Sequence, residues 1–148
     1  MALKKATRSA QKVMSAEFVV NFNDTMVDVN GVTKTFGSVY TDAGTFEVIN
    51  LPQGAVIIGG DLIVETAGVG PTVYTMSVGN SGSATAYLAA TNLLASARTA
   101  LTGLGLGSND GKNVRVTIAS TVANATDGKF RLRVEYVIDG RAEEVNPN

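Results

Sequence analysis

Apolar side chains occupy every second position in the segment from Lys129 to Ile138. They are Phe130, Leu132, Val134, Tyr136 and Ile138, and between them lie Lys129, Arg131, Arg133 and Glu135. In a β-strand, a period of two places the two kinds of side chain on opposite faces. One face of this strand must therefore pack in a core while the other meets solvent, which commits the chain to a half-buried sheet.

The same alternation recurs along most of the sequence. We expect strands in residues 17–23, 26–36, 45–51, 55–65, 72–78, 84–90 and 114–118. Asn30-Gly31 predicts a hairpin turn within one of these segments, and Gly59-Gly60 predicts a bulge or sharp bend within another. Only residues 93–101 favour a helix by composition. Eight or nine strands without βαβ alternation predict an all-β, antiparallel two-sheet sandwich of the jelly-roll kind.

A chain of 148 residues, 45% of them hydrophobic, is long enough to bury a core of its own. No linker or internal repeat divides it. We expect a basic N-terminal arm in residues 1–15, one β-sandwich domain in residues 16–140 and a C-terminal tail in residues 141–148.

The chain contains no His and no Cys. It therefore has neither a Ser-His nor a Cys-His nucleophile pair, and no zinc site of the usual ligands. The glycine-rich residues 103–107 lack the spacing of a phosphate loop. Asp61 and Glu65 share a strand face roughly 13 Å apart, and we interpret them as solvated. We expect no enzyme activity, no metal and no cofactor.

The formal net charge of −1 is unevenly distributed. Residues 1–12 contain Lys4, Lys5, Arg8 and Lys12 and no acid, a charge of +4, so the remainder carries −5. The arm is either a solvated tail or a segment that docks on an acidic protein surface, and we predict the second. Nucleic acid is not expected as a partner, because four charges without interleaved aromatics make a poor footprint.

Lys129, Arg131 and Arg133 place three like charges in succession on the outward face of the last strand. Such charges repel one another unless acids oppose them. Pairing with acids within the chain, or solvation of the charges, is the preferred interpretation, and an ion-pair patch between subunits is the alternative. For the last case, Arg131 and Arg133 are the predicted contact residues.

The nine aromatic residues bear on sugar binding, which many β-sandwiches perform by stacking sugar rings on exposed aromatics. Phe18, Phe22, Phe46, Phe130 and Tyr136 fall on expected core faces. Tyr40, Tyr74 and Tyr87 remain as candidates for a sugar-binding surface. No apolar run is long enough for a secretory signal or a membrane span, so we expect synthesis in the cytoplasm and no membrane partner.

Two segments resemble small structural proteins of tailed bacteriophages. They are "GGDLIVETAGVGPTVYTMSVGNSGSATAYLAATNL" and, after a variable loop, "VRVTIAS" with "ATDGKFRLRVEYVIDGRAEE". The matching positions are Gly79, Gly82, Tyr87, Arg133, Tyr136 and Arg141. The group often has Asp and Arg where this chain has Asn80 and Ala86, so an ion pair between these positions is not implied.

The group is similar to head decoration, or cement, proteins with jelly-roll folds. The resemblance implies a structural protein on the capsid exterior, made in a bacterial host, that bridges subunits of the major capsid protein and forms a dimer or trimer. Under this hypothesis, Lys4, Lys5, Arg8 and Lys12 contact the capsid first and the Arg131/Arg133 face second. The alternative is a receptor- or glycan-binding module of a phage head fibre or tail.

Overall fold

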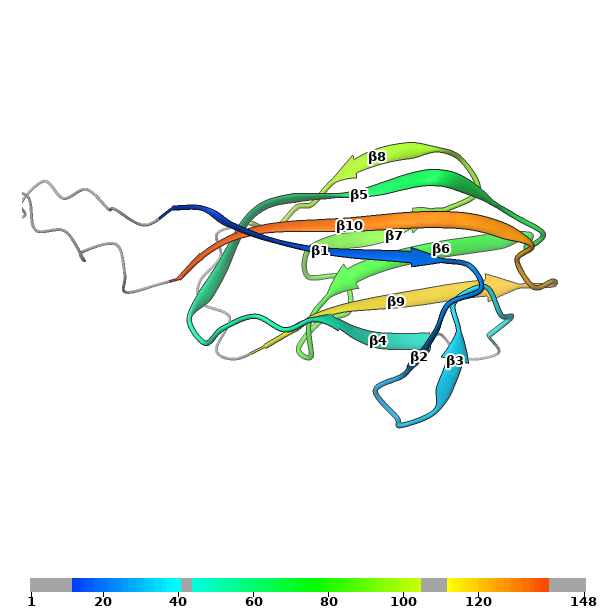
Figure 1. Ribbon diagram of the computed structural model, residues 1–148, viewed down its shortest axis with the longest axis horizontal. Coiled ribbons are helices and arrows are strands. Elements are labelled where there is room, and N and C mark those ends of the chain that lie inside the picture. Colours follow the sequence, from blue (N-terminus) through cyan, green and yellow to red (C-terminus); the bar gives the residue numbers. More distant parts are fainter. Residues whose placement is uncertain (1–11, 41–43, 105–111, 139–148) are drawn as a thin grey trace, which may run out of the picture.

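The computed structural model describes residues 12–40, 44–104 and 112–138, and these form ten strands without a helix (Figure 1). The strands are β1 (Met14–Asn21), β2 (Thr25–Val27), β3 (Thr33–Thr35), β4 (Gly44–Ile49), β5 (Ala55–Val69), β6 (Val73–Gly79), β7 (Leu88–Asn92), β8 (Ala97–Ala100), β9 (Val114–Thr121) and β10 (Asp127–Ile138).

Eight of these strands form two four-stranded antiparallel sheets that lie one over the other (Figure 1). One sheet has the order β1-β10-β5-β8 and the other the order β4-β9-β6-β7, while β2 and β3 form a separate hairpin. In this nested order the first strand pairs with the last. The expected antiparallel two-sheet sandwich is confirmed.

The core lies between the sheets and is built from the inward positions of the alternating strands. Val114, Val116 and Ile118 of β9 face Phe130, Leu132 and Val134 of β10, and all six are fully buried. Aromatic rings join the elements: the Phe36 and Phe46 centroids are 4.5 Å apart, and Tyr74 meets Phe130 edge-on at 5.4 Å. The alternation in the sequence thus places the core correctly.

The two longest strands, β5 and β10, pair along their whole length. Their register shifts where Glu135 lies opposite Gly59, so the bulge expected at Gly59-Gly60 is confirmed. Gly60 has φ of 139°, and an added Cβ would lie 2.2 Å from the carbonyl oxygen of Arg133. Only glycine fits this close approach of two backbones.

The hairpin of β2 and β3 is held by Asp28, which is buried. Its Oδ1 accepts hydrogen bonds from the backbone N–H groups of Asn30 and Val32, each at 2.9 Å, and its Oδ2 pairs with Lys34 at 2.8 Å. The Lys34 ammonium and then the Val32 N–H lower the pKa of Asp28. Gly31 takes φ of 80° at the turn, which confirms the hairpin predicted at Asn30-Gly31.

Two expectations for the second half of the chain need correction. The helix over residues 93–101 is wrong, because Ala97–Ala100 forms β8 and pairs with β5, while Leu93 and Leu101 pack in the core. A nine-residue helix is marginal alone, so pairing with an existing sheet prevails. The strand expected at residues 84–90 begins only at Leu88.

Candidate partner-binding surface

The basic arm is the first part of the predicted contact surface. Lys4, Lys5 and Arg8 lie outside the described residues. Lys12 is exposed and lies two residues before β1. The role of these four residues therefore stays a prediction.

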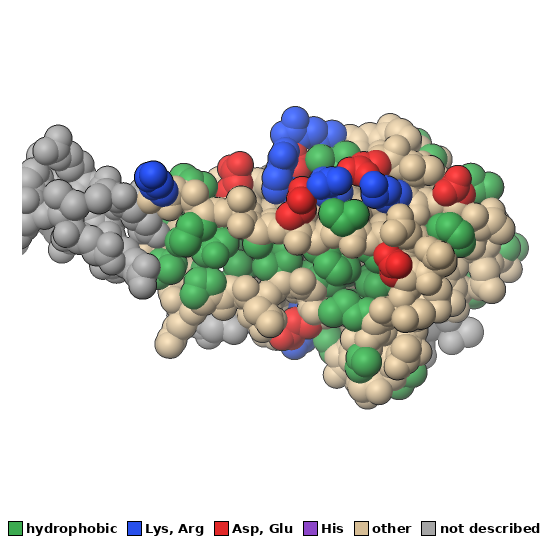
Figure 2. Space-filling model, viewed as in Figure 1, with side chains coloured by type: hydrophobic (Ala, Val, Ile, Leu, Met, Phe, Trp, Pro, Cys, Tyr) green, Lys and Arg blue, Asp and Glu red, His purple; other side chains and the backbone are tan. Residues whose placement is uncertain are grey.

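The second predicted contact, the Arg131/Arg133 face, lies on the outer side of the β1-β10-β5-β8 sheet. Figure 2 shows Lys and Arg side chains gathered there with Asp and Glu over the upper sheet. The three basic residues of β10 are all paired within the chain. Lys129 contacts Glu65 at 2.9 Å, and Arg131 and Arg133 contact acids on the strands beside β10. Of the interpretations that the sequence left open for these charges, the contacts support pairing within the chain.

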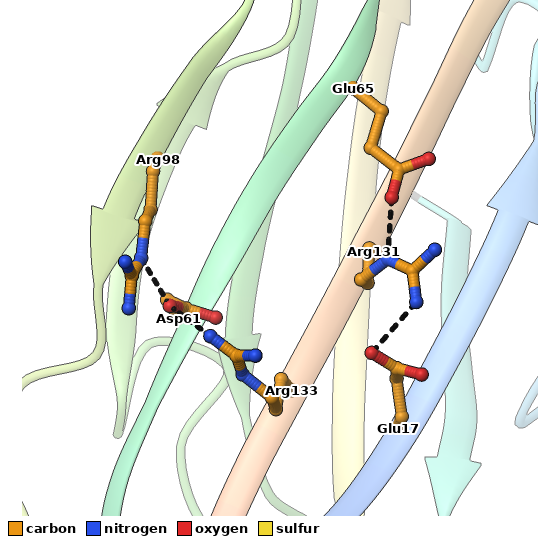
Figure 3. A network of polar contacts seen from close by, with 6 residues as sticks. All are labelled: Glu17, Asp61, Glu65, Arg98, Arg131 and Arg133. Carbon is orange, nitrogen blue, oxygen red and sulfur yellow. Dashed lines mark hydrogen bonds and ion pairs between the residues drawn. The ribbon is translucent and has the colours of Figure 1, made fainter.

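Arg131 lies between two carboxylates (Figure 3). One of its nitrogens contacts Glu17 of β1 at 2.9 Å, and its Nε donates to Glu65 of β5. Hydrogen bonds with Glu17 first, and then with Glu65, raise the pKa of Arg131. Lys129, followed by Arg131, lowers the pKa of Glu65. Charges on three adjacent strands thus neutralise one another.

Asp61 is the reverse case, a single carboxylate between two arginines (Figure 3). Its Oδ2 accepts hydrogen bonds from Nε of Arg98 on β8 and, at 3.0 Å, from Arg133. Only 2% of Asp61 is exposed, so the expectation that Asp61 belongs to a solvated face is wrong. Buried carboxylates are stable when they are paired in this way.

Arg98 is not among the contact residues predicted from the sequence, because the composition of residues 93–101 favours a helix. The register explains its position: Arg133 lies opposite Asp61 on β5, and Ala100 lies opposite Asp61 on β8, with Arg98 two residues away on the same face. The available signal was a pair of bases, Arg131 and Arg133, on one face of a predicted strand and a pair of acids, Asp61 and Glu65, on one face of another. It becomes informative only once the strands are known to be neighbours.

A smaller polar cluster lies on the other sheet. Glu47 of β4 contacts Arg115 of β9 at 2.9 Å and accepts a hydrogen bond from the Asn113 amide at 2.7 Å. Asn113, and then Arg115, lowers the pKa of Glu47. Asn113 also accepts from the backbone N–H of Leu51, so this cluster fastens the segment after β4 to the start of β9.

Three of the residues that carry the phage resemblance, Gly79, Gly82 and Tyr87, lie in or beside a tight turn after β6. Oδ1 of Asn80 accepts hydrogen bonds from the N–H groups of Gly82 and Ser83, at 2.8 and 3.1 Å, and its Nδ2 donates to the Tyr87 hydroxyl at 3.2 Å. An amide network therefore holds this turn. Arg141, another matching residue, lies outside the described residues.

The aromatic residues give little support to a sugar-binding surface. Of the three candidates, Tyr40 and Tyr74 are buried and Tyr87 is half-buried. The five aromatics assigned to core faces are buried or half-buried too. Among residues 12–40, 44–104 and 112–138, no aromatic ring is exposed as a stacking platform.

The same described ranges contain neither a metal-binding cluster nor a membrane-spanning helix. No three His, Cys, Asp or Glu side chains there come together in a group that could hold a metal ion. Nor do these ranges contain a helix with the length and apolar character needed to cross a bilayer.

Comparison with known proteins gives matches at the level of structure. No family model matches the chain, and no curated protein matches it. The chain is similar to a chain of the structure described as the capsid asymmetric unit of cyanophage Pam1, with 28% identity and a TM-score of 0.59 over 93% of this chain and 91% of that one. It is also similar to a chain of the capsid of Ralstonia phage GP4, with 19% identity and a TM-score of 0.53 over the same shares.

The second likeness, at 19% identity, shows the fold alone. The first extends over nearly the whole chain, and both structures are phage capsids. The first likeness therefore supports the coarser part of the expectation drawn from the sequence, a structural protein related to phage capsids.

Proposed function

We propose that this chain is a non-enzymatic structural protein of a tailed-phage virion, which decorates the exterior of the capsid and stabilises it by bridging neighbouring subunits of the major capsid protein. The observation that carries the proposal is the likeness to a chain of the Pam1 capsid over 93% of the sequence. The resemblance of residues 79–87 and 128–136 to phage decoration proteins, described under the sequence, is consistent with it.

The described structure suits a protein that works by surface contact. Its two sheets enclose a mainly apolar core, and cross-strand ion pairs cover the outer face of one sheet. Such a scaffold presents a rigid surface at low entropic cost on binding. The basic N-terminal arm would reach an acidic surface on a neighbouring subunit, and the body would associate as a dimer or trimer.

Binding to capsids tests the proposal directly. Purified protein is added to capsids from a phage strain that lacks the gene, and bound protein is measured by co-sedimentation and located by cryo-electron microscopy. We expect saturable binding on the outer surface, with density between major capsid subunits. Saturable binding in a glycan array together with no binding to capsids would instead favour the receptor- or glycan-binding module.

A deletion of residues 1–12 tests the arm separately. The remaining chain still contains every described strand, since β1 begins at Met14. It should fold and bind capsids weakly. A full-length variant with Gln at positions 4, 5, 8 and 12 is the matched control, because it keeps the length of the arm and removes its charge. Full retention of binding by both proteins would rule out the role of the arm.

A further inference from the structure

The outer face of the β1-β10-β5-β8 sheet contains two ion-pair clusters that differ in their ratio of acidic to basic side chains. In the first, Glu17 and Glu65 alternate with Lys129 and Arg131, so two negative charges meet two positive ones. In the second, one carboxylate, Asp61, meets two guanidinium groups, those of Arg98 and Arg133. The first cluster is neutral and the second keeps an excess charge of +1.

The second cluster also differs in exposure. The Arg98 side chain is 68% exposed and that of Arg133 is 40% exposed, whereas only 3% of the Asp61 side chain is exposed. Each guanidinium has five N–H donors. In the described part of the chain, Arg98 and Arg133 each make a single hydrogen bond, to Oδ2 of Asp61. Donors of both groups therefore remain available at the surface.

Asp61 restricts both arginines before any partner arrives. Its carboxylate is buried, and Oδ1 has no hydrogen-bond partner among the described residues, so Oδ2 is the atom that anchors both guanidinium groups. An anchored arginine loses less side-chain entropy when it binds. Arginine pairs well with carboxylates because its donors form a planar fork.

We propose that Arg98 and Arg133, held by Asp61, form a docking site for an aspartate or glutamate side chain on the surface of the protein that this chain decorates. The proposal rests on the proposed function and names the chemistry of the contact. Arg131 is not part of the site, because Glu17 and Glu65 already neutralise it. Those acids, with Glu135 over Gly59, repel a polyanion such as nucleic acid, so the site favours a single carboxylate.

Substitution of the exposed arginine tests the site on capsids. Arg98→Gln removes one charge, and Arg115→Gln removes the same charge from the other sheet as a matched control. With capsids that lack this protein, we expect Arg98→Gln to bind about tenfold more weakly and with a smaller dependence on NaCl concentration, and Arg115→Gln to bind within about twofold of wild type.

Arg98→Lys is the second variant, because it keeps the charge that supports Asp61 while losing the planar fork. It should fold like wild type and still bind several-fold more weakly. If wild type binds capsids and both Arg98 variants bind equally well, this inference fails while the proposed function stands.

A measurement without capsids tests the carboxylate site independently of the proposed function. Side-chain Nε–Hε signals of arginine are followed by NMR while N-acetyl-L-glutamate α-amide, which carries a single side-chain carboxylate, is added to the full chain. We expect the Arg98 and Arg133 signals to shift saturably and those of Arg131 and Arg115 to move less. Such shifts in a chain that does not bind capsids would overturn the proposed function and keep the carboxylate site, whereas equal or absent shifts would overturn the site.

Discussion

The hydroxyl of Tyr74 donates a hydrogen bond to the backbone carbonyl of Phe36 over 2.9 Å, deep within the sandwich. Both residues are fully buried, and burial raises the pKa of the Tyr74 phenol. The Tyr74 ring meets Phe130 of the opposite sheet edge-on. Since Phe36 follows the hairpin of β2 and β3, one side chain links that segment to both sheets.

Tyr74→Phe should therefore lower the free energy of unfolding by about 1–2 kcal/mol, because it leaves a buried carbonyl without its donor while keeping the ring contact. Urea denaturation measures the change. Tyr87→Phe is the matched control, since Tyr87 is only half-buried, and it should cost less than about 0.5 kcal/mol. Equal stability of Tyr74→Phe and wild type would contradict the importance of this bond.

Gly60→Ala should be among the most destabilising substitutions in the chain. The new Cβ would lie 2.2 Å from the Arg133 carbonyl oxygen at φ of 139°, so β5 and β10 would have to separate. We expect a loss of about 3 kcal/mol or more in urea denaturation. Gly31→Asn is the control, because Gly31 at φ of 80° has no atom within 4 Å of an added Cβ and Asn tolerates this conformation. It should change stability by less than about 1 kcal/mol.

Val122 is a β-branched residue in the left-handed region, with φ of 77° and 80% of its surface exposed. That conformation costs an L-residue about 1–2 kcal/mol, and the exposed side chain recovers little by packing. Val122→Asn should raise the free energy of unfolding by about 1 kcal/mol and the melting temperature by about 2–6 °C. Val122→Thr keeps the branching and should give no gain. A lower melting temperature for the asparagine variant would contradict this prediction.

Glu65 should contribute to the pH dependence of stability. Its pKa is lowered below the ordinary value of 4.5 by Lys129 first and then Arg131. The folded state therefore binds the proton less readily, so the stabilisation is present above pH 4.5 and is lost as the pH falls through the lowered pKa. Glu65→Gln should be less stable than wild type at pH 7, and the difference should shrink as the pH falls below 4.5. Thermal denaturation across this range measures it.

Ionic strength provides the check on this explanation. Exposed ion pairs are screened by salt, so 1 M NaCl should also reduce the difference between Glu65→Gln and wild type at pH 7. A difference that is insensitive to both pH and salt would show that Glu65 acts through packing.

The alternation of side chains predicted much of the fold correctly. It assigned Phe130, Leu132 and Val134 to the core, and Asn30-Gly31 predicted the hairpin. Composition, not alternation, predicted the helix at residues 93–101, and this was wrong because Ala97–Ala100 pairs with β5. For the candidate site, the alternation indicated Arg131 and Arg133 as outward residues but missed Arg98.

The sequence by itself determined which side of each main strand is buried, because a period of two is local and follows directly from strand geometry. It also determined the division of charge between a basic arm and an acidic body. Only the tertiary structure decided that Asp61 lies between Arg98 and Arg133. These residues are 37 and 72 positions from Asp61, and core packing sets the strand order and register that bring them together.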